Sequence, residues 1–182
     1  EEPISMDARD LLIEEHSALH SAAVGGNKAS MAERTFGGLT DDQMRVRPRE
    51  DLNSLAWLMW HIARAEDIMT NIIVNGREQV YDDGWMQRLK IARRDFGIGM
   101  TMPEVAELSA TIDLAALRDY RDAVGLRTQE IVRAYGEKDW EGNLEAAAVE
   151  RAGTLGCFGD RTEALTKAFT GRPRRAVLTG IV

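Results

Sequence analysis

Apolar residues recur at helical spacing along most of this 182-residue chain, and strand-like alternation is almost absent. The clearest case is residues 52–75. Seven apolar residues of this segment share one broad arc of a helix: Leu55, Leu58, Met59, Ile62, Met69, Ile72 and Ile73. Arg64, Asp67 and Asn71 lie on the opposite, polar side. This periodicity predicts an all-α fold.

Capping residues divide the N-terminal half into helices. Asp7 is a plausible N-cap for a first helix that ends at the Gly25-Gly26 pair. Thr40 can cap a short helix, which Pro48 prevents from continuing. Ser54, or Asn53 before it, can cap a second long helix that runs to about residue 75.

A long connection follows the second helix, and such connections are often functional. It extends over residues 77–102 with one short helix expected near Trp85, and Pro103 starts another. Asp113 can cap a third long helix, a further helix is expected at residues 161–169, and Pro173 begins the last one. Long helices with one extended crossover predict a four-helix bundle. We expect residues 1–182 to form one domain.

Charge and composition exclude several classes of function. The net charge of −7 and a pI near 5.1 argue against nucleic acids and anionic membranes as partners. Cys157 is the single cysteine, so no intrachain disulfide can form, and a cytoplasmic location is the simplest expectation. No segment has the roughly 20 apolar residues of a membrane span. We therefore expect a small-molecule substrate.

All three histidines are predicted to point inward. His61 falls on the apolar side of the second helix, whereas His16 and His20 are four residues apart and share the apolar face of the first. Glu66 lies at the other edge of the apolar arc, as an interior polar group, and Trp57 lies near His61 as a candidate wall of a pocket.

Two interpretations of these histidines stay open. A histidine on an apolar helix face is commonly a core residue whose ring nitrogens meet a carbonyl or carboxylate. The pair in "HSALH" also has the i, i+4 spacing with which two imidazoles bind one ion, as in helix-borne zinc sites. It lacks the glutamate of an HExxH protease motif.

Three segments together resemble the DinB/YfiT-like superfamily, particularly its actinobacterial members: "GLTDDQMRVRP", "LNSLAWLMWHIARAED" and the late "TGRPRRAVLTGIV". The resemblance implies a four-helix bundle, often dimeric, so we expect a homodimer. It also implies a metal triad with one histidine from helix 2 and an HxxxH pair from the last helix. His61 matches the helix 2 ligand.

The last helix departs from the family pattern. No HxxxH follows residue 170. The last helix begins at Pro173, and the sequence ends only about ten residues later, so we expect this helix to be truncated. Either a missing part carries the two other ligands, or His16 and His20 complete a three-histidine site with His61.

The resemblance also implies a reaction class. Studied relatives include S-transferases and an isomerase that use mycothiol or bacillithiol as a thiol co-substrate. Zn²⁺ or Ni²⁺ suits imidazole ligands, and a bound cation favours the thiolate form of a low-molecular-weight thiol. We therefore expect a metal-dependent thiol transferase or isomerase. The alternative is a non-enzymatic bundle that binds a small molecule or a protein partner.

Overall fold

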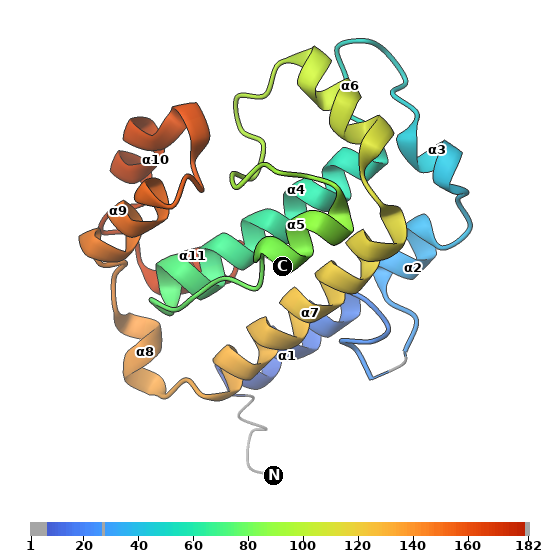
Figure 1. The fold of residues 1–182 in the computed structure, drawn as a ribbon. Coiled ribbons are helices and arrows are strands. Elements are labelled where there is room, and N and C mark those ends of the chain that lie inside the picture. Colours follow the sequence, from blue (N-terminus) through green and yellow to red (C-terminus); the bar gives the residue numbers. More distant parts are fainter. Residues whose placement is uncertain (1–6, 27, 181–182) are drawn as a thin grey trace.

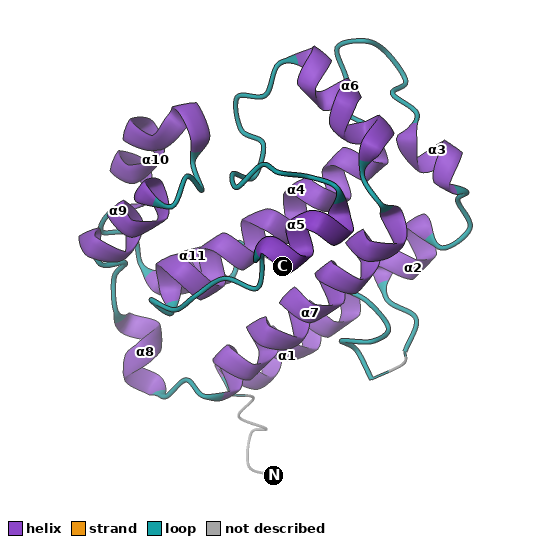
Figure 2. Ribbon diagram, viewed as in Figure 1, coloured by secondary structure: helices purple, strands orange, loops and turns teal. Residues whose placement is uncertain are grey.

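The structure, a computed structural model, describes residues 7–26 and 28–180. Within this part the chain forms helices joined by loops, and no β-strand is present (Figure 2). The long elements are α1 (Ala8–Leu19), α4 (Leu55–Asp67) with its π-helical continuation η1 (Ile68–Val74), and α7 (Leu114–Arg133). The predicted all-α fold is confirmed. No helix among the described residues has the length and apolar character to span a membrane.

Shorter helices complete the fold: α2 (Met31–Phe36), α3 (Asp41–Arg45), α5 (Asp83–Leu89), α6 (Met102–Thr111), α8 (Glu137–Glu141), α9 (Ala146–Thr154), the 3-10 turn η2 (Gly159–Arg161), α10 (Thr162–Phe169) and α11 (Arg174–Leu178). The side chains of Asp7, Thr40, Ser54 and Asp113 accept the expected capping hydrogen bonds. The short helix predicted near Trp85 is α5, and the one predicted to start at Pro103 is α6. Helix α2, which Ser30 caps, was not predicted.

The first helix is shorter than predicted. Helix α1 ends at Leu19, and a turn leads to Gly26. The Ser21 hydroxyl accepts a hydrogen bond from the backbone N–H of Val24, and Arg121 of α7 donates to the carbonyl of His20. Serine side chains that bond to nearby backbone in this way compete with helix continuation. These two bonds explain the early end.

Helix α4 lies at the centre of the fold (Figure 1). Helix α7 packs along α4 and also contacts α1, so the three longest helices are neighbours. Beyond α4, η1 is covered by α9 and α11, whereas α3 and α6 pack on α4 itself. Apolar side chains fill the interior on both parts of this continuous helix: Trp60, Leu117 and Tyr120 around α4, and Ile72 and Phe158 around η1. Each such side chain stabilises the fold by about 1.5–3 kcal/mol.

The polar side of α4 is also buried. Arg64 and Asp67 of α4 and Asn71 of η1, which lie opposite the apolar arc, each have 0% of their surface exposed. The crossover after η1 folds back over them. Asp67 accepts hydrogen bonds from the backbone N–H groups of Val80 and Tyr81, at 2.8 and 2.9 Å. A face that an amphipathic helix would turn to water is therefore covered by the crossover.

Candidate metal centre

His16 of α1, His20 at the C-cap of α1 and Glu66 of α4 meet inside the bundle. His16 and His20 are 3% exposed and Glu66 is 2% exposed. His16 and His20 are one helical turn apart, so their rings lie on the same face, with centroids 4.8 Å apart. Glu66 reaches this face from α4, which places one carboxylate against two imidazoles.

The three side chains are spaced as ligands of one ion. His16 Nε2 lies 2.8 Å from Glu66 Oε1, and His20 Nε2 lies 3.3 Å from Glu66 Oε2. One donor atom from each residue lies within 4.8 Å of the other two. Donors at about 2.0–2.1 Å from a tetrahedral zinc ion are about 3.3 Å from one another. Across the described residues, His16, His20 and Glu66 are the one group with metal-ligand composition and spacing.

The hydrogen bonding of the cluster is incomplete. His20 Nδ1 is 3.3 Å from the Ser21 hydroxyl oxygen, but His20 Nε2 has no aligned hydrogen-bond partner among the described residues, and neither does His16 Nδ1. An imidazole lone pair that faces a carboxylate oxygen is repelled unless a proton or another cation lies between them. Each Nε2 atom next to Glu66 therefore carries either a hydrogen that it donates to the carboxylate or a bound cation.

Ionisation in this buried cluster favours the forms that bind metals. Burial lowers the pKa of His20, and this outweighs the opposing effect of Glu66, so the neutral imidazole is favoured. Burial raises the pKa of Glu66, but the contacts with His16 and His20 lower it by more, so the carboxylate stays charged. Metal ligands are neutral imidazoles and ionised carboxylates. Donor type, spacing and charge of the cluster therefore fit a divalent metal ion.

Helix α7 holds His20 in position. A Cβ atom on Gly125 would lie 2.6 Å from Cε1 and Nε2 of the His20 ring, so only glycine leaves room for the imidazole there. One turn earlier on the same helix, Arg121 donates a hydrogen bond to the His20 carbonyl oxygen. The ring and the backbone of His20 are thus both fixed by α7.

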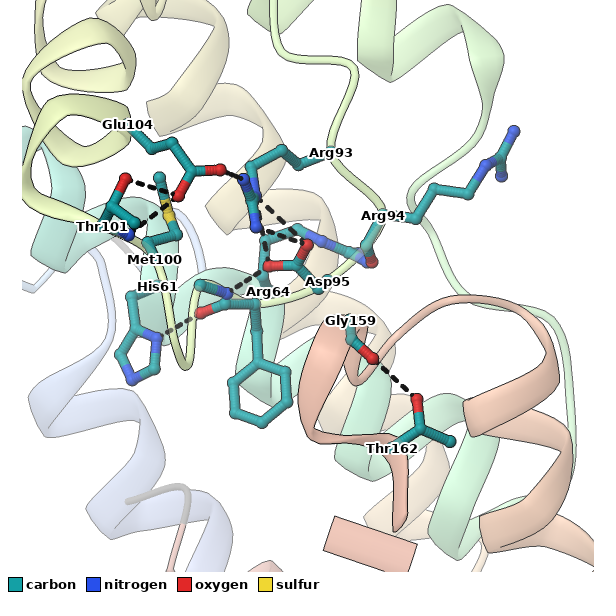
Figure 3. Close-up of polar contacts among 12 residues, drawn as sticks. His61, Arg64, Arg93, Arg94, Asp95, Met100, Thr101, Glu104, Gly159 and Thr162 are labelled. Atoms are coloured by element: carbon teal, nitrogen blue, oxygen red, sulfur yellow. Dashed lines mark hydrogen bonds and ion pairs between the residues drawn. The ribbon is translucent and has the colours of Figure 1, made fainter. Parts of the chain in front are cut away.

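His61 lies in a different environment. Its half-buried ring stacks on Trp57, with centroids 4.8 Å apart and planes 9° apart, and also on Phe96 at 5.7 Å. Its Nδ1 atom forms a hydrogen bond with the carbonyl oxygen of Phe96. Figure 3 shows the His61 ring beside the loop that carries Asp95, Met100 and Thr101. His61 is not a member of the group that His16, His20 and Glu66 form.

Ion pairs hold this loop against His61 (Figure 3). Arg93 lies between Asp95 and Glu104, at 3.1 and 2.6 Å. Hydrogen bonds from Thr101, and then from Arg93, lower the pKa of Glu104 to about 2. Asp95 also accepts a hydrogen bond from the N–H of Gly97 at 2.7 Å. The Phe96 carbonyl that contacts His61 therefore lies in a fixed segment.

Sequence reasoning named all members of the cluster but not their grouping. His16 and His20 were predicted to share an inward face, and Glu66 was predicted to be an interior polar group, but the one metal site considered for the pair was with His61. The available signal was the HxxxH pair together with an inward carboxylate on the neighbouring long helix. Trp57, the predicted pocket residue, packs on His61, and its Nε1 lies 3.2 Å from the sulfur of Met100.

Comparisons with known proteins give the family. The family model described as the DinB superfamily matches residues 28–160, which include His61 and Glu66 and begin after His16 and His20. A search of the curated proteins finds no match. The matched range covers most of the chain, and its helical fold agrees with a DinB-like bundle. The chain belongs to the DinB superfamily.

Proposed function

We propose that this chain binds one divalent metal ion through His16, His20 and Glu66 and uses it in a reaction of a low-molecular-weight thiol. The single observation that carries the proposal is the meeting of two buried imidazole nitrogens with both oxygens of one carboxylate, at 2.8 and 3.3 Å. A thiol of the mycothiol type is the expected co-substrate, in a transfer to an electrophile or an isomerisation.

The ligand set supports a catalytic site. Three protein ligands leave a coordination position for a small molecule, as in catalytic zinc sites, whereas structural zinc sites use four. Zn²⁺ and Ni²⁺ both suit imidazole with carboxylate. A bound ion of this kind would lower the pKa of a thiol that coordinates it and so supply a thiolate near neutral pH.

The chain's own residues orient these ligands. When Nε2 of His20 acts as the donor atom, the proton of the ring lies on Nδ1, and the Ser21 hydroxyl is placed to accept it. Gly125 leaves the space that the His20 ring occupies. Glu66 supplies the negative charge that offsets part of the charge of a divalent ion. The burial of all three ligands excludes bulk water from the centre.

His61 is a second candidate ligand, and one observation favours it. A hydrogen bond from Nδ1 to the Phe96 carbonyl leaves Nε2 as the free donor atom, which is the usual arrangement for a histidine that binds a metal. It is also the position that the resemblance to the family assigns. Other ligands would have to join His61, because His16, His20 and Glu66 form their own group.

Metal binding by matched glutamine variants tests the proposal. We expect the purified protein to hold about one Zn²⁺ or Ni²⁺ per chain, and a Co²⁺-loaded sample to show the visible absorption of a nitrogen- and oxygen-ligated ion. Glu66→Gln and His20→Gln should each weaken metal binding by more than the roughly 10–100-fold that an outer-shell partner contributes. His61→Gln, the matched control, should bind metal like the unmodified chain.

Circular dichroism and thermal unfolding separate lost ligands from lost folding in each variant. If His61→Gln abolishes the Co²⁺ spectrum and Glu66→Gln keeps it, the ion is at His61 and the buried cluster is only a hydrogen-bonded core. A protein that holds no metal, and is equally stable with and without a chelator, would support the non-enzymatic binding module. Both outcomes overturn the assignment to His16, His20 and Glu66.

A further inference from the structure

A cavity of about 260 Å³ lies next to the His16/His20/Glu66 cluster. Residues of α2, α4 and α7 and of the turn after α1 line it, among them Ser21, Phe36, Met59, Arg118, Arg121 and Asp122. Ligand pockets for drug-sized molecules measure about 300–1,000 Å³, so this cavity suits a smaller molecule. Ser21, which contacts Nδ1 of His20, forms part of its wall.

Arg121 is the positively charged residue of this cavity that lacks an ion-pair partner among the described residues. Its guanidinium is half-buried and donates one hydrogen bond to the His20 carbonyl, but no carboxylate of the described residues lies within ion-pair distance of it. Partial burial of a cation without an ion pair is unfavourable, and a bound anion would offset that cost.

Two of the other charged groups of the wall, Glu33 and Arg118, are already engaged, whereas the Asp122 side chain has no hydrogen bond or ion pair among the described residues. The Glu33 carboxylate accepts hydrogen bonds from the N–H groups of Ala22 and Ser30, both at 2.8 Å, and from the Ser30 hydroxyl. Arg118 is exposed and pairs with Asp41 at 3.4 Å. Arg121 is thus the cation of the cavity that has donors to spare, because four of its five N–H groups are not used by the His20 carbonyl.

We propose that this cavity binds a small, apolar carboxylic acid, with the carboxylate on Arg121 and the hydrocarbon part against Phe36, Leu39 and Met59. The inference rests on the proposed function only in its coupling to the metal centre, because Ser21 and Arg121 line the cavity and contact His20, whereas the three ligands themselves do not line it. The ligand class follows from the wall, which combines one unpaired guanidinium with apolar side chains in a space too small for a large ligand.

Two contacts connect the cavity to the metal ligands. Ser21 contacts the His20 ring, and Arg121 bonds to the His20 backbone. A divalent ion beside Glu66 replaces a net negative charge near Arg121 with a net positive one, so a carboxylate on Arg121 binds more tightly to the metal-loaded protein. Since coupling between two sites is reciprocal, the carboxylate must strengthen metal binding by the same factor.

Calorimetric titration with benzoate tests the site, with benzyl alcohol as a neutral probe of similar shape. We expect benzoate to bind the full chain and benzyl alcohol to bind at least about tenfold more weakly, because it lacks the charge that Arg121 requires. Arg121→Gln should weaken benzoate binding by about tenfold or more, whereas the matched control Arg118→Gln should change it by less than about threefold.

The titration is run on metal-free and on Zn²⁺-loaded protein, so that the two proposals can fail separately. Tighter benzoate binding in the loaded protein, lost in Arg121→Gln while Co²⁺ absorption is retained, supports the inference. The carboxylate site is overturned if benzoate and benzyl alcohol bind with equal affinity. It is also overturned if benzoate binds Arg121→Gln as tightly as Arg118→Gln, even if metal binds to the cluster. If no metal binds but Arg121-dependent benzoate binding persists, the cavity is a carboxylate site and the proposed function, with the coupling, is wrong.

Discussion

Helix α4 carries two buried carboxylates in consecutive positions, and their surroundings differ sharply. Asp67 accepts hydrogen bonds from five donors: Arg64 Nη1, Asn71 Nδ2, the N–H groups of Val80 and Tyr81, and the Tyr120 hydroxyl, at 2.6–3.2 Å. Glu66, on another side of the same helix, has the imidazoles of His16 and His20 as its only polar side-chain partners among the described residues. One anion is fully satisfied, and the other keeps capacity for a further cation.

The cation that accompanies Asp67 is also nearly saturated. Arg64 donates to the Tyr120 hydroxyl at 3.0 Å, to Gln79 at 2.9 Å and to the Arg94 carbonyl at 2.5 Å, and its guanidinium lies 4.1 Å from the centre of the Tyr81 ring. These partners belong to the crossover and to α7. The Arg64–Asp67 pair therefore has the properties of a structural lock, whereas the histidine cluster has those of an ion-binding site.

The largest expected effect concerns the lock. Asp67→Asn removes the anion beside buried Arg64 and replaces acceptor capacity with an N–H₂ group that faces other donors. Breaking a buried ion pair in this way costs about 3–5 kcal/mol in the free energy of unfolding, which urea denaturation measures. Metal binding by the folded fraction should persist. A loss below about 1 kcal/mol would show that the network does not act as a lock.

A smaller effect is expected at the wall of the histidine cluster. Gly125→Ala places a methyl group 2.6 Å from two atoms of the His20 ring, so we expect a loss of about 1–3 kcal/mol in stability and weaker metal binding. Helix propensity alone predicts that Gly125→Ala raises the free energy of unfolding by about 1 kcal/mol. A measured decrease would therefore show that the clash with the His20 ring outweighs helix propensity. Leu126→Ala, at the neighbouring exposed position, is the control and should change stability by less than about 0.5 kcal/mol.

The smallest expected effect is the pH dependence of the metal-free protein. Because the pKa of His20 is lowered in the fold, the unfolded chain binds a proton near pH 6.5 that the folded chain does not, so stability falls as pH drops below 6.5. The pKa of Glu66 is also lowered, so a second loss begins as pH drops below 4.5. Urea denaturation at several pH values measures both.

Glu66→Gln is the matched variant for this pH dependence. It should remove the loss below pH 4.5 that arises from Glu66 while the remaining carboxyl groups titrate as before. A curve identical to that of the unmodified chain would contradict a charged Glu66 in the buried cluster. The result would also sharpen the contrast with Asp67, whose hydrogen bonds come largely from neutral backbone and hydroxyl donors.

Local signals in the sequence predicted most helix starts correctly. Capping by Asp7, Thr40, Ser54 and Asp113 depends on the residue itself and on the next three positions, so no tertiary information is needed. The helix that Pro103 was predicted to begin also depends on a local signal, whereas no capping residue was named for the short helix predicted near Trp85. The early end of α1 was not predicted, because Arg121, about 100 positions away, binds the carbonyl of His20.

The sequence singled out the residues of the candidate site but not their roles or their arrangement, because His61 was the expected metal ligand and Glu66 was expected only as an interior polar group. Helical spacing placed His16 and His20 on one inward face, but the partner that meets them depends on how α1 and α4 pack. The periodicity of the second helix placed Glu66 at the edge of the apolar arc and Arg64 and Asp67 opposite that arc. It contains no information on which other segments cover each side of the helix. The homodimer, the thiol and the cytoplasmic location stay predictions.

By itself, the sequence determined that the chain is helical, where most helices begin, and that His16 and His20 share an inward face, because periodicity and capping are properties of neighbouring residues. His61, also predicted to point inward, is half-buried. Only the tertiary structure decided that Glu66, rather than His61, joins His16 and His20, and that the crossover buries the polar side of α4. Contacts between residues 50 positions apart depend on helix packing, which the pattern along one helix does not specify.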